Sequence, residues 1–325
     1  MHIHRIAVVY DVPGWAYERR ANALLRYAPM DFQVDTCAVA DESTRVAISG
    51  GNVDLVFLLD YSVSATIAKW CREAKIPIVV SHNSGPLRRR EWLRALCRAA
   101  DYVICNNVET FEGRSPGCGN CCAIPNGVDT EVFRPLTAPH GRPDRCLWCG
   151  AKAKTYKGWL DVIEPLRPLA EAAGFECDFR LVRNRDDYLD LRHQVEWYNN
   201  GAYILSAATE GHEGTPNTIL EGVACGCVAV STRSGNINEW GVDRQNCVLS
   251  CRSPQAFLDA LCYARDHRSD LAEAGQSLIC SQWSYRVRAP HYFALFRKIL
   301  QHGATSVRPF RYDETPPLNR FDESQ

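Results

Sequence analysis

The sequence predicts an α/β protein made of two Rossmann-like domains, each built on a doubly wound parallel sheet. Three observations support this fold class. Short apolar runs alternate with helix-like segments through most of the chain. A stretch rich in proline and turn-forming residues, 137–144, divides the chain into two halves. The length of 325 residues also suits two domains of roughly 150 residues each.

Composition excludes several classes of protein. The hydrophobic fraction of 46% and the charged fraction of 23% are ordinary for a soluble globular protein. A net charge of −1 gives no global attraction to nucleic acid or membrane. No apolar run approaches the roughly 20 residues that span a bilayer, and the first residues lead into a strand rather than a signal peptide. We therefore expect a cytoplasmic protein with reduced cysteines.

Residues 1–136 form the first predicted domain, in which strands and helices alternate. The expected strands are Arg5–Tyr10, Gln33–Val39, Val53–Leu59, Ile76–Ser81, Asp101–Asn106 and Cys122–Ile124. The expected helices include Tyr17–Tyr27, Ser64–Ala74 and Arg90–Ala100. Ligands of such sheets bind beyond the carboxyl ends of the strands. Gly14, in the loop after the first strand, would permit close approach to a ligand or would simply form a turn.

A basic segment, 88–98, opens one of these helices with five arginines around an apolar stripe. The usual meaning of this pattern is a solvated face on a packed helix. The alternative is that Arg88, Arg89 and Arg90 contact an anionic acceptor or partner. Such a partner would be either lipid phosphate at a membrane surface or nucleic acid.

Residues 145–284 form the second predicted domain, and 137–144 form the linker. The expected strands are Arg145–Cys149, Phe175–Val182, Ala202–Ser206, Val228–Ser231 and Cys247–Leu249. Helices are expected after Trp159, from about Asp187 to Tyr198, and at Pro254–Ala264 and Ser269–Cys280. A last helix, 285–302, is predicted to return to the first domain. Residues 303–325 lack periodicity and read as a loosely ordered tail.

The stretch 213–226 predicts a helix between two buried strands. Thr215 is placed to be its N-cap, Pro216 its first residue and Gly226 its left-handed end. The free N–H groups at this helix start would belong to Asn217, Thr218 and Ile219. Together with the positive end of the helix dipole, they form the kind of site that holds phosphate.

Two carboxylates, Glu213 and Glu221, frame this helix start with seven residues between them. A carboxylate offers paired acceptor oxygens that can grip a vicinal diol of a sugar or ribose. With phosphates held between them, the arrangement suits a nucleotide sugar. The alternative is an ordinary strand–helix–strand crossover whose two glutamates are solvated surface charges.

The stretch Glu-Gly-Thr-Pro-Asn-Thr-Ile-Leu-Glu-Gly-Val-Ala-Cys-Gly resembles the Glu-(seven residues)-Glu signature of retaining glycosyltransferases of the GT-B fold, in particular family four. Segments 124–135 and 232–239 are also similar to that family. The resemblance implies two Rossmann-like domains facing a cleft. It further implies that Glu213 contacts the donor sugar and Glu221 the ribose, and that His82, at the end of the fourth strand, reaches the donor sugar.

Three of the six lysines lie at 152, 154 and 157. A flexible ammonium beyond a strand end is a good partner for phosphate. The family carries a Gly-Arg…Lys-Gly signature here, whose Arg and Lys bind the donor diphosphate. Lys157 matches the Lys. The Arg position is Ala151, so Lys152 or Lys154 would have to replace it.

The resemblance implies a hexosyl- or pentosyltransferase that moves a sugar, with retention, from a nucleotide-diphosphate sugar to a hydroxyl. The expected donor is a UDP- or GDP-sugar, and no cofactor is expected. No Asp-x-Asp occurs, so a metal-independent route is favoured. The expected catalytic residues are Glu213, Lys157 and His82. The expected donor-binding residues are Glu221, Lys152, Lys154, Gly214, Thr215, Pro216, Asn217, Thr218 and Gly14.

Several alternatives remain open from the sequence. The acceptor could be a glycan, a lipid-linked sugar, a small molecule or a hydroxylated base in DNA. A GT-B-like sugar-nucleotide epimerase or hydrolase would need no acceptor at all. A non-catalytic protein would bind the nucleotide sugar and turn nothing over.

Sixteen cysteines include two C-x2-C pairs, Cys118 with Cys121 and Cys146 with Cys149. This spacing is typical of zinc ligands. Against a zinc site, Cys146 and Cys149 fall on a predicted strand, where residues three apart face opposite sides. The sequence leaves zinc binding open.

Overall fold

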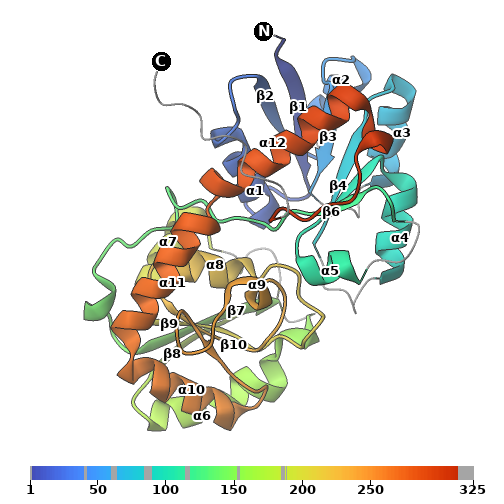
Figure 1. Cartoon of the computed structure of the whole chain (residues 1–325). Helices are drawn as coiled ribbons and strands as arrows, with labels where there is room; N and C mark the ends of the chain where they lie inside the picture. The colour runs from blue at the N-terminus through green and yellow to red at the C-terminus, as the bar shows by residue number, and fades with distance from the viewer. Residues whose placement is uncertain are drawn as a thin grey trace.

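A computed structural model describes residues 2–39, 42–59, 64–83, 90–113, 118–151, 154–183, 187 and 189–313. It confirms the predicted fold class, with one sheet of six strands and one of five, both flanked by helices (Figure 1). Every pair of neighbouring strands is parallel. Because a parallel sheet is covered on both faces, its strands read as continuous apolar runs rather than alternating ones.

The N-terminal sheet has the order β2-β1-β3-β4-β5-β6. Its strands are β1 (His4–Tyr10), β2 (Phe32–Ala38), β3 (Leu55–Leu58), β4 (Ile78–His82), β5 (Tyr102–Cys105) and β6 (Cys121–Ala123). Helix α1 (Ala16–Arg26) contributes to the core on one face. The other face is covered by α2 (Glu42–Ser49), α3 (Ser64–Ala74), α4 (Arg90–Ala99) and α5 (Val108–Glu112).

The C-terminal sheet has the order β11-β10-β9-β7-β8. Its strands are β7 (Arg145–Ala151), β8 (Glu176–Val182), β9 (Tyr203–Ser206), β10 (Val228–Ser231) and β11 (Val248–Leu249). One face packs against α6 (Glu164–Ala172) and α10 (Pro254–Asp266), and the other against α7 (Leu191–Asn199), α8 (Asn217–Ala224) and α9 (Ile237–Trp240). Helix α11 (Arg268–Gln282) contributes to both cores. A π-helical turn, η4 (Trp159–Ile163), leads into α6.

The linker and the last helix tie the two domains together. Arg142, buried in the linker, donates hydrogen bonds to the backbone oxygens of Tyr198, Gly201 and Cys225 in the C-terminal domain. Helix α12 (Tyr285–His302) then runs back along the N-terminal domain (Figure 1). Its Phe293 and Phe296 join the core on the α1 face of the first sheet.

The prediction of a loose tail from residue 303 is wrong for residues 303–313. After a short turn, η6 (Ala304–Ser306), the chain runs beside β6, where the backbone N–H of Tyr312 donates to Ala123 O at 3.1 Å. Val307 is buried against the same domain. The apolar residues of segment 303–313 are too few and too irregularly spaced to give a periodic signal. Residues 314–325 lie outside the described part of the chain.

Helix α7 also differs from prediction. It begins at Leu191 rather than near Asp187, because the side chain of Asp190 accepts the N–H of His193 and caps the helix there. The short helices α2, α5 and α9 were not predicted. None of the helices described combines the length and apolar character that crossing a membrane requires.

Candidate active site

A cavity of about 400 Å³ lies between the two domains, at the carboxyl ends of the strands. The N-terminal domain contributes residues that follow β1 and β4, together with the start of α1. The C-terminal domain contributes the end of β7, the loop after it that carries Lys154 and Lys157 (the lysine loop), and the start of α8. Among the predicted site residues, those that line the cavity are Lys154, Lys157, Glu213, Gly214, Thr215, Asn217, Thr218 and Glu221.

Helix α8 begins one residue later than predicted, at Asn217. Its N-cap is Pro216, not Thr215, and Pro216 does not line the cavity. The hydroxyl of Thr215 instead donates to Asn106 O in the N-terminal domain at 3.0 Å. The N–H of Ile219 bonds Pro216 O at 2.9 Å, so it does not point out of the helix start as expected. Gly226 ends the helix as predicted, with a left-handed φ of 90°.

Gly214 brings the two domains into close contact. A Cβ at this position would lie 2.7 Å from Asn83 O and 2.7 Å from the side-chain amide of Asn106. Only glycine leaves room for these three loops to meet. The loop before α8 thus packs against the N-terminal domain, and this contact fixes the position of the helix start in the cavity.

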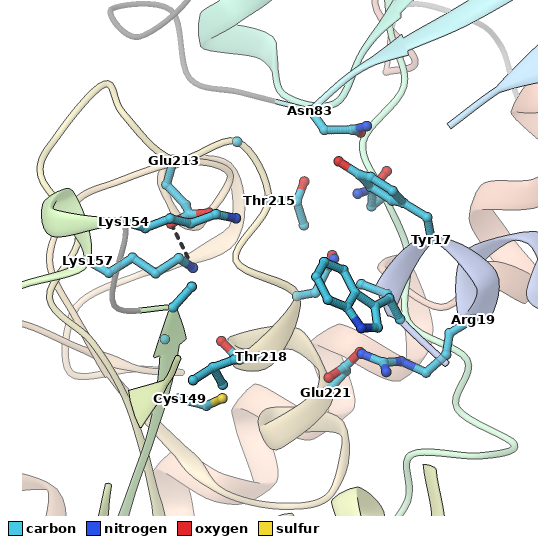
Figure 2. A pocket seen from close by; sticks show the side chains of 18 of the residues that line it. Tyr17, Arg19, Asn83, Cys149, Lys154, Lys157, Glu213, Thr215, Thr218 and Glu221 are labelled. Atoms are coloured by element: carbon cyan, nitrogen blue, oxygen red, sulfur yellow. Dashed lines mark hydrogen bonds and ion pairs between the residues drawn. The ribbon is translucent and has the colours of Figure 1, made fainter. Parts of the chain in front are cut away.

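Glu213 and Lys157 form an ion pair of 3.2 Å inside the cavity (Figure 2). Their side chains are only 11% and 19% exposed. Burial alone would lower the pKa of Lys157, but attraction to Glu213 outweighs it and the net pKa is raised. Lys157 therefore carries its charge at neutral pH, and the cavity holds a fixed cation beside the start of α8.

Glu221 is held by three partners from both domains. Oε2 accepts hydrogen bonds from the hydroxyl of Tyr198 at 2.7 Å and from Gln194 Nε2 at 3.0 Å. Oε1 accepts from Arg19 of α1 at 3.2 Å, across the domain boundary. Burial and the nearby charge of Glu221 raise the pKa of Tyr198, so its hydroxyl remains a donor. The carboxylate is thus oriented toward the cavity rather than solvated.

The structure describes only part of the lysine loop, from Lys154 onward. Lys154 lines the cavity together with Glu213 and Lys157. Lys152 lies outside the described residues. Lys154 follows β7 by three residues, and Ala151 is the last residue of that strand.

His82 does not lie where the resemblance implies. It is the last residue of β4, and its side chain has no exposed surface and does not line the cavity. Burial lowers its pKa to about 4, so it is neutral at physiological pH. Asn83, one residue later, lines the cavity instead. Because successive strand residues point to opposite sides, a shift of one residue decides which side chain faces the ligand.

Gly14 also lies outside the cavity lining. It has a φ of +83°, and its N–H donates to the carboxylate of Glu18 at 2.6 Å. The N–H of Trp15 bonds Val12 O, which closes the turn. Gly14 is therefore a turn residue, whereas Trp15 itself lines the cavity.

The basic segment is only partly described. Arg88 and Arg89 lie outside the described residues, and Arg90 is the first residue of α4. Arg94 and Arg98 are exposed on that helix, while Leu93 and Leu96 are buried against the sheet. The described part of α4 is thus an amphipathic helix with a charged outer face.

The two C-x2-C pairs cannot form one zinc site, because they lie in different domains. Cys118 and Cys121 are buried in the N-terminal domain, where Cys121 is the first residue of β6, whereas Cys146 and Cys149 lie on β7. Cys146 packs into the C-terminal core, and Cys149 faces the cavity. Over the described residues, the one cluster with metal-like ligand spacing is His2, His4 and Asp54, at the opposite end of the N-terminal sheet from the cavity.

Sequence reasoning missed several residues that the fold brings to this site. The lining also includes Asp11, Tyr17, Asn106, Asn126, Arg180 and Trp197. Asn126 belongs to the 124–135 segment that matched the family, which was the one available signal. The segment 232–239 contacts the N-terminal domain through α9: the Glu239 carboxylate accepts the N–H of Val108, at the start of α5, at 2.8 Å.

Comparisons with known proteins extend these observations. No protein-family model matches the chain, and no curated protein matches its sequence. Among solved structures, Anabaena HepE in complex with UDP and glucose is similar, with a TM-score of 0.68, 11% identity and coverage of 91% of this chain and 100% of that one.

Two further structures are similar over comparable lengths. Sucrose-phosphate synthase from Thermosynechococcus elongatus has a TM-score of 0.68, 12% identity, and coverage of 91% of this chain and 99% of that one. A glycosyltransferase from Rickettsia africae has a TM-score of 0.67, 13% identity, and coverage of 93% and 100%. The likeness establishes that this chain has the GT-B fold.

Proposed function

We propose that this protein is a retaining glycosyltransferase that moves a sugar from a nucleotide-diphosphate sugar to a hydroxyl acceptor without a metal ion. One observation carries the proposal. Glu213, Glu221 and Lys157 line a single cavity at the start of α8, between the two domains of a GT-B fold. Two independent sequence signals, the paired glutamates and the lysine, thus converge in space.

Each group has a role that its chemistry suits. The carboxylate of Glu221 accepts hydrogen bonds from the ribose hydroxyls, and Glu213 accepts them from the donor sugar. The start of α8 and the ammonium of Lys157 bind the diphosphate. Lys154 lines the same cavity and adds a second positive charge.

Catalysis then depends on stabilising the leaving group. As the bond between the anomeric carbon and the phosphate oxygen breaks, negative charge grows on the diphosphate beside Lys157. A donor placed at such a point can lower the barrier by about 3 kcal/mol. The acceptor oxygen bonds to the anomeric carbon on the same face, and its proton passes to the departing phosphate oxygen. The products are a glycoside and a nucleoside diphosphate.

The neighbours give a starting point for the donor. HepE was solved with UDP-glucose as well as with UDP and glucose, which supports a UDP-sugar as the first donor to test. The acceptor would approach from the N-terminal side, where Trp15, Tyr17 and Asn83 line the cavity. A glycan, a lipid-linked sugar and a small molecule are the acceptors to test first.

Thermal stability with nucleoside diphosphates tests the donor site. We expect one of UDP, GDP, ADP, CDP and dTDP to raise the melting temperature of the wild type, because a ligand that binds the native state stabilises it. Glu221→Gln should abolish this rise. Glu196→Gln is the matched control, because Glu196 is an exposed partner of Arg192 on α7 and does not line the cavity. If no diphosphate stabilises the wild type, with or without magnesium, the proposal fails.

Product analysis tests the reaction. NMR of the glycoside should show the same anomeric configuration as the donor, and an inverted product would contradict the retaining mechanism. Turnover of donor without any acceptor would instead indicate a hydrolase or an epimerase. Binding of donor without turnover for any acceptor would indicate a non-catalytic binder.

A further inference from the structure

Ala151 stands where the glycosyltransferase signature has arginine, so the loop after β7 offers the cavity two lysines, Lys154 and Lys157, and no guanidinium. The fold brings another arginine to the same cavity from the opposite domain. Arg19 lies in the first turn of α1, and it lines the cavity together with Asn217, Thr218 and Lys157. No sequence pattern connects it with the donor site.

Cys149 lies on the cavity lining together with these charged residues. The thiol faces the cavity, and burial raises its pKa. The charges of Lys157, Glu221, Arg180 and Arg19 all act on that thiol as well. Arg19 and Lys157 both line this cavity, one from each domain. In Figure 2 the Arg19 side chain reaches Glu221 from the N-terminal domain.

The guanidinium of Arg19 has hydrogen-bonding capacity left over. Its side chain is 18% exposed, and its Nη2 donates to Glu221 Oε1. Among the residues that the structure describes, no acceptor lies within reach of its buried Nε–H. A buried N–H without an acceptor is costly, and an arginine presents a planar set of donors that fits a phosphate. An anion in the cavity would reach this N–H only after the guanidinium turns away from Glu221.

We propose that Arg19 binds the diphosphate of the donor and so supplies, from the N-terminal domain, the guanidinium that the loop after β7 lacks. The inference rests on the proposed function. When the ribose hydroxyls take the oxygens of Glu221, Arg19 leaves Oε1 and turns to the phosphates. The resulting bonds are charge-assisted, and these are the stronger kind of hydrogen bond.

A consequence concerns the two domains. Arg19 belongs to the N-terminal domain, whereas Lys157 and Glu221 belong to the C-terminal one. A donor held by all three residues bridges the cleft through its phosphates. Donor binding therefore stabilises the contact between the domains, in addition to filling the donor site.

The test separates binding of phosphate from support of Glu221. Affinities are measured by calorimetry for UDP, GDP, ADP, CDP and dTDP and for the matching nucleosides, which lack phosphate. Arg19→Ala should weaken the diphosphate that binds best by about 10- to 100-fold, as expected for loss of a charged hydrogen bond. The affinity for the nucleoside should fall by less than about threefold, because the nucleoside has no phosphate for Arg19 to bind. That change is smaller than the tenfold loss that is the least expected for the diphosphate.

Two further variants complete the experiment. Arg19→Gln removes the charge but keeps a side chain of similar length, and it should weaken the diphosphate as Arg19→Ala does. Arg26→Ala is the matched control, because Arg26 lies on the same helix, pairs with Asp129 and does not line the cavity. It should leave both affinities unchanged.

The outcomes are distinct. Equal loss for nucleoside and diphosphate would mean that Arg19 acts only through Glu221, and it would overturn the proposal. Unchanged affinity for both would overturn it as well. If the wild type binds a nucleoside diphosphate, the proposed function stands whichever result Arg19 gives. If the wild type binds none of the five, the proposed function fails and the role of Arg19 fails with it.

Discussion

At the scale of single residues, each signature carboxylate holds a cation of the same cavity. Glu213 pairs with Lys157 and Glu221 with Arg19, both at 3.2 Å. Both pairs are largely buried, so breaking one without replacing it would leave a charge uncompensated. Under the proposed function, a nucleotide sugar would provide the replacement, since its hydroxyls would bind the carboxylates while its phosphates would bind the cations. Two such exchanges would give the site a preference for a ligand that carries both groups.

Glu239 gives a pH-dependent prediction at this scale. Burial raises its pKa to about 7, although the N–H of Val108 and the positive charges of Arg288 and Arg311 act in the opposite direction. A carboxyl whose pKa is raised on folding binds more protons in the folded state. Its contribution to stability is therefore full below about pH 4.5 and is lost as the pH rises through about 7.

Glu239→Gln should remove this loss, because the amide oxygen can still accept the N–H of Val108 but does not ionise. Between pH 5 and pH 8, urea unfolding should show the variant gaining about 1–3 kcal/mol relative to the wild type. Other titrating groups affect both proteins equally and cancel in the difference. Parallel stability profiles for the two proteins would rule out Glu239 as the source of the pH dependence.

At the scale of elements, α8 is positioned by loops rather than by its own cap. Thr215 donates a hydrogen bond to Asn106 O, and Gly214 packs against Asn83. Contacts with the N-terminal domain therefore fix the position of the helix start. At its other end, Arg142 of the linker donates to Cys225 O at 2.8 Å, just beyond the helix. The linker is therefore a structural part of the C-terminal domain and not a loose connection.

Arg142→Ala should destabilise the protein strongly. The buried guanidinium also bonds Asn199 Oδ1 at 2.9 Å, and its removal leaves several buried acceptors unsatisfied. We expect a loss of about 3 kcal/mol in urea unfolding. The control is Arg145→Ala, since Arg145 pairs with Glu176 near the surface and should contribute less than about 1 kcal/mol. Equal effects of the two variants would contradict the assigned role of Arg142.

At the scale of the whole molecule, the C-terminal helix is part of the N-terminal core. Phe296 has no exposed surface, and its ring centroid lies 5.3 Å from that of Phe57 on β3. Tyr292 of the same helix bonds Ile124 O at 2.9 Å and accepts a bond from Arg20. The chain therefore crosses the domain boundary twice, through the linker and through α12, which restricts how far the cleft can open.

A pair of core substitutions tests this arrangement. Phe296→Ala should cost about 3–5 kcal/mol, as is usual for a buried aromatic residue. Hydrogen exchange should rise first in β1 and β3, although both strands are far from the substituted residue in the sequence. Phe257→Ala is the matched variant, because Phe257 is buried in the C-terminal core, and it should raise exchange in β9 and β10 instead. The same exchange pattern for both would contradict separate cores.

The sequence by itself determined the fold class and half of the site. Alternating strand and helix patterns are local, so they predicted both parallel sheets, and the Glu213–Glu221 spacing is carried by one loop and helix. Only the tertiary structure decided the rest. Arg19 meets Glu221 across 202 positions of sequence, and Glu239 meets Val108 across 131. Such contacts depend on how two domains are oriented, which no local pattern encodes. The exchange of His82 for Asn83 has the same origin, because only the end of the packed strand fixes which side chain faces the cleft.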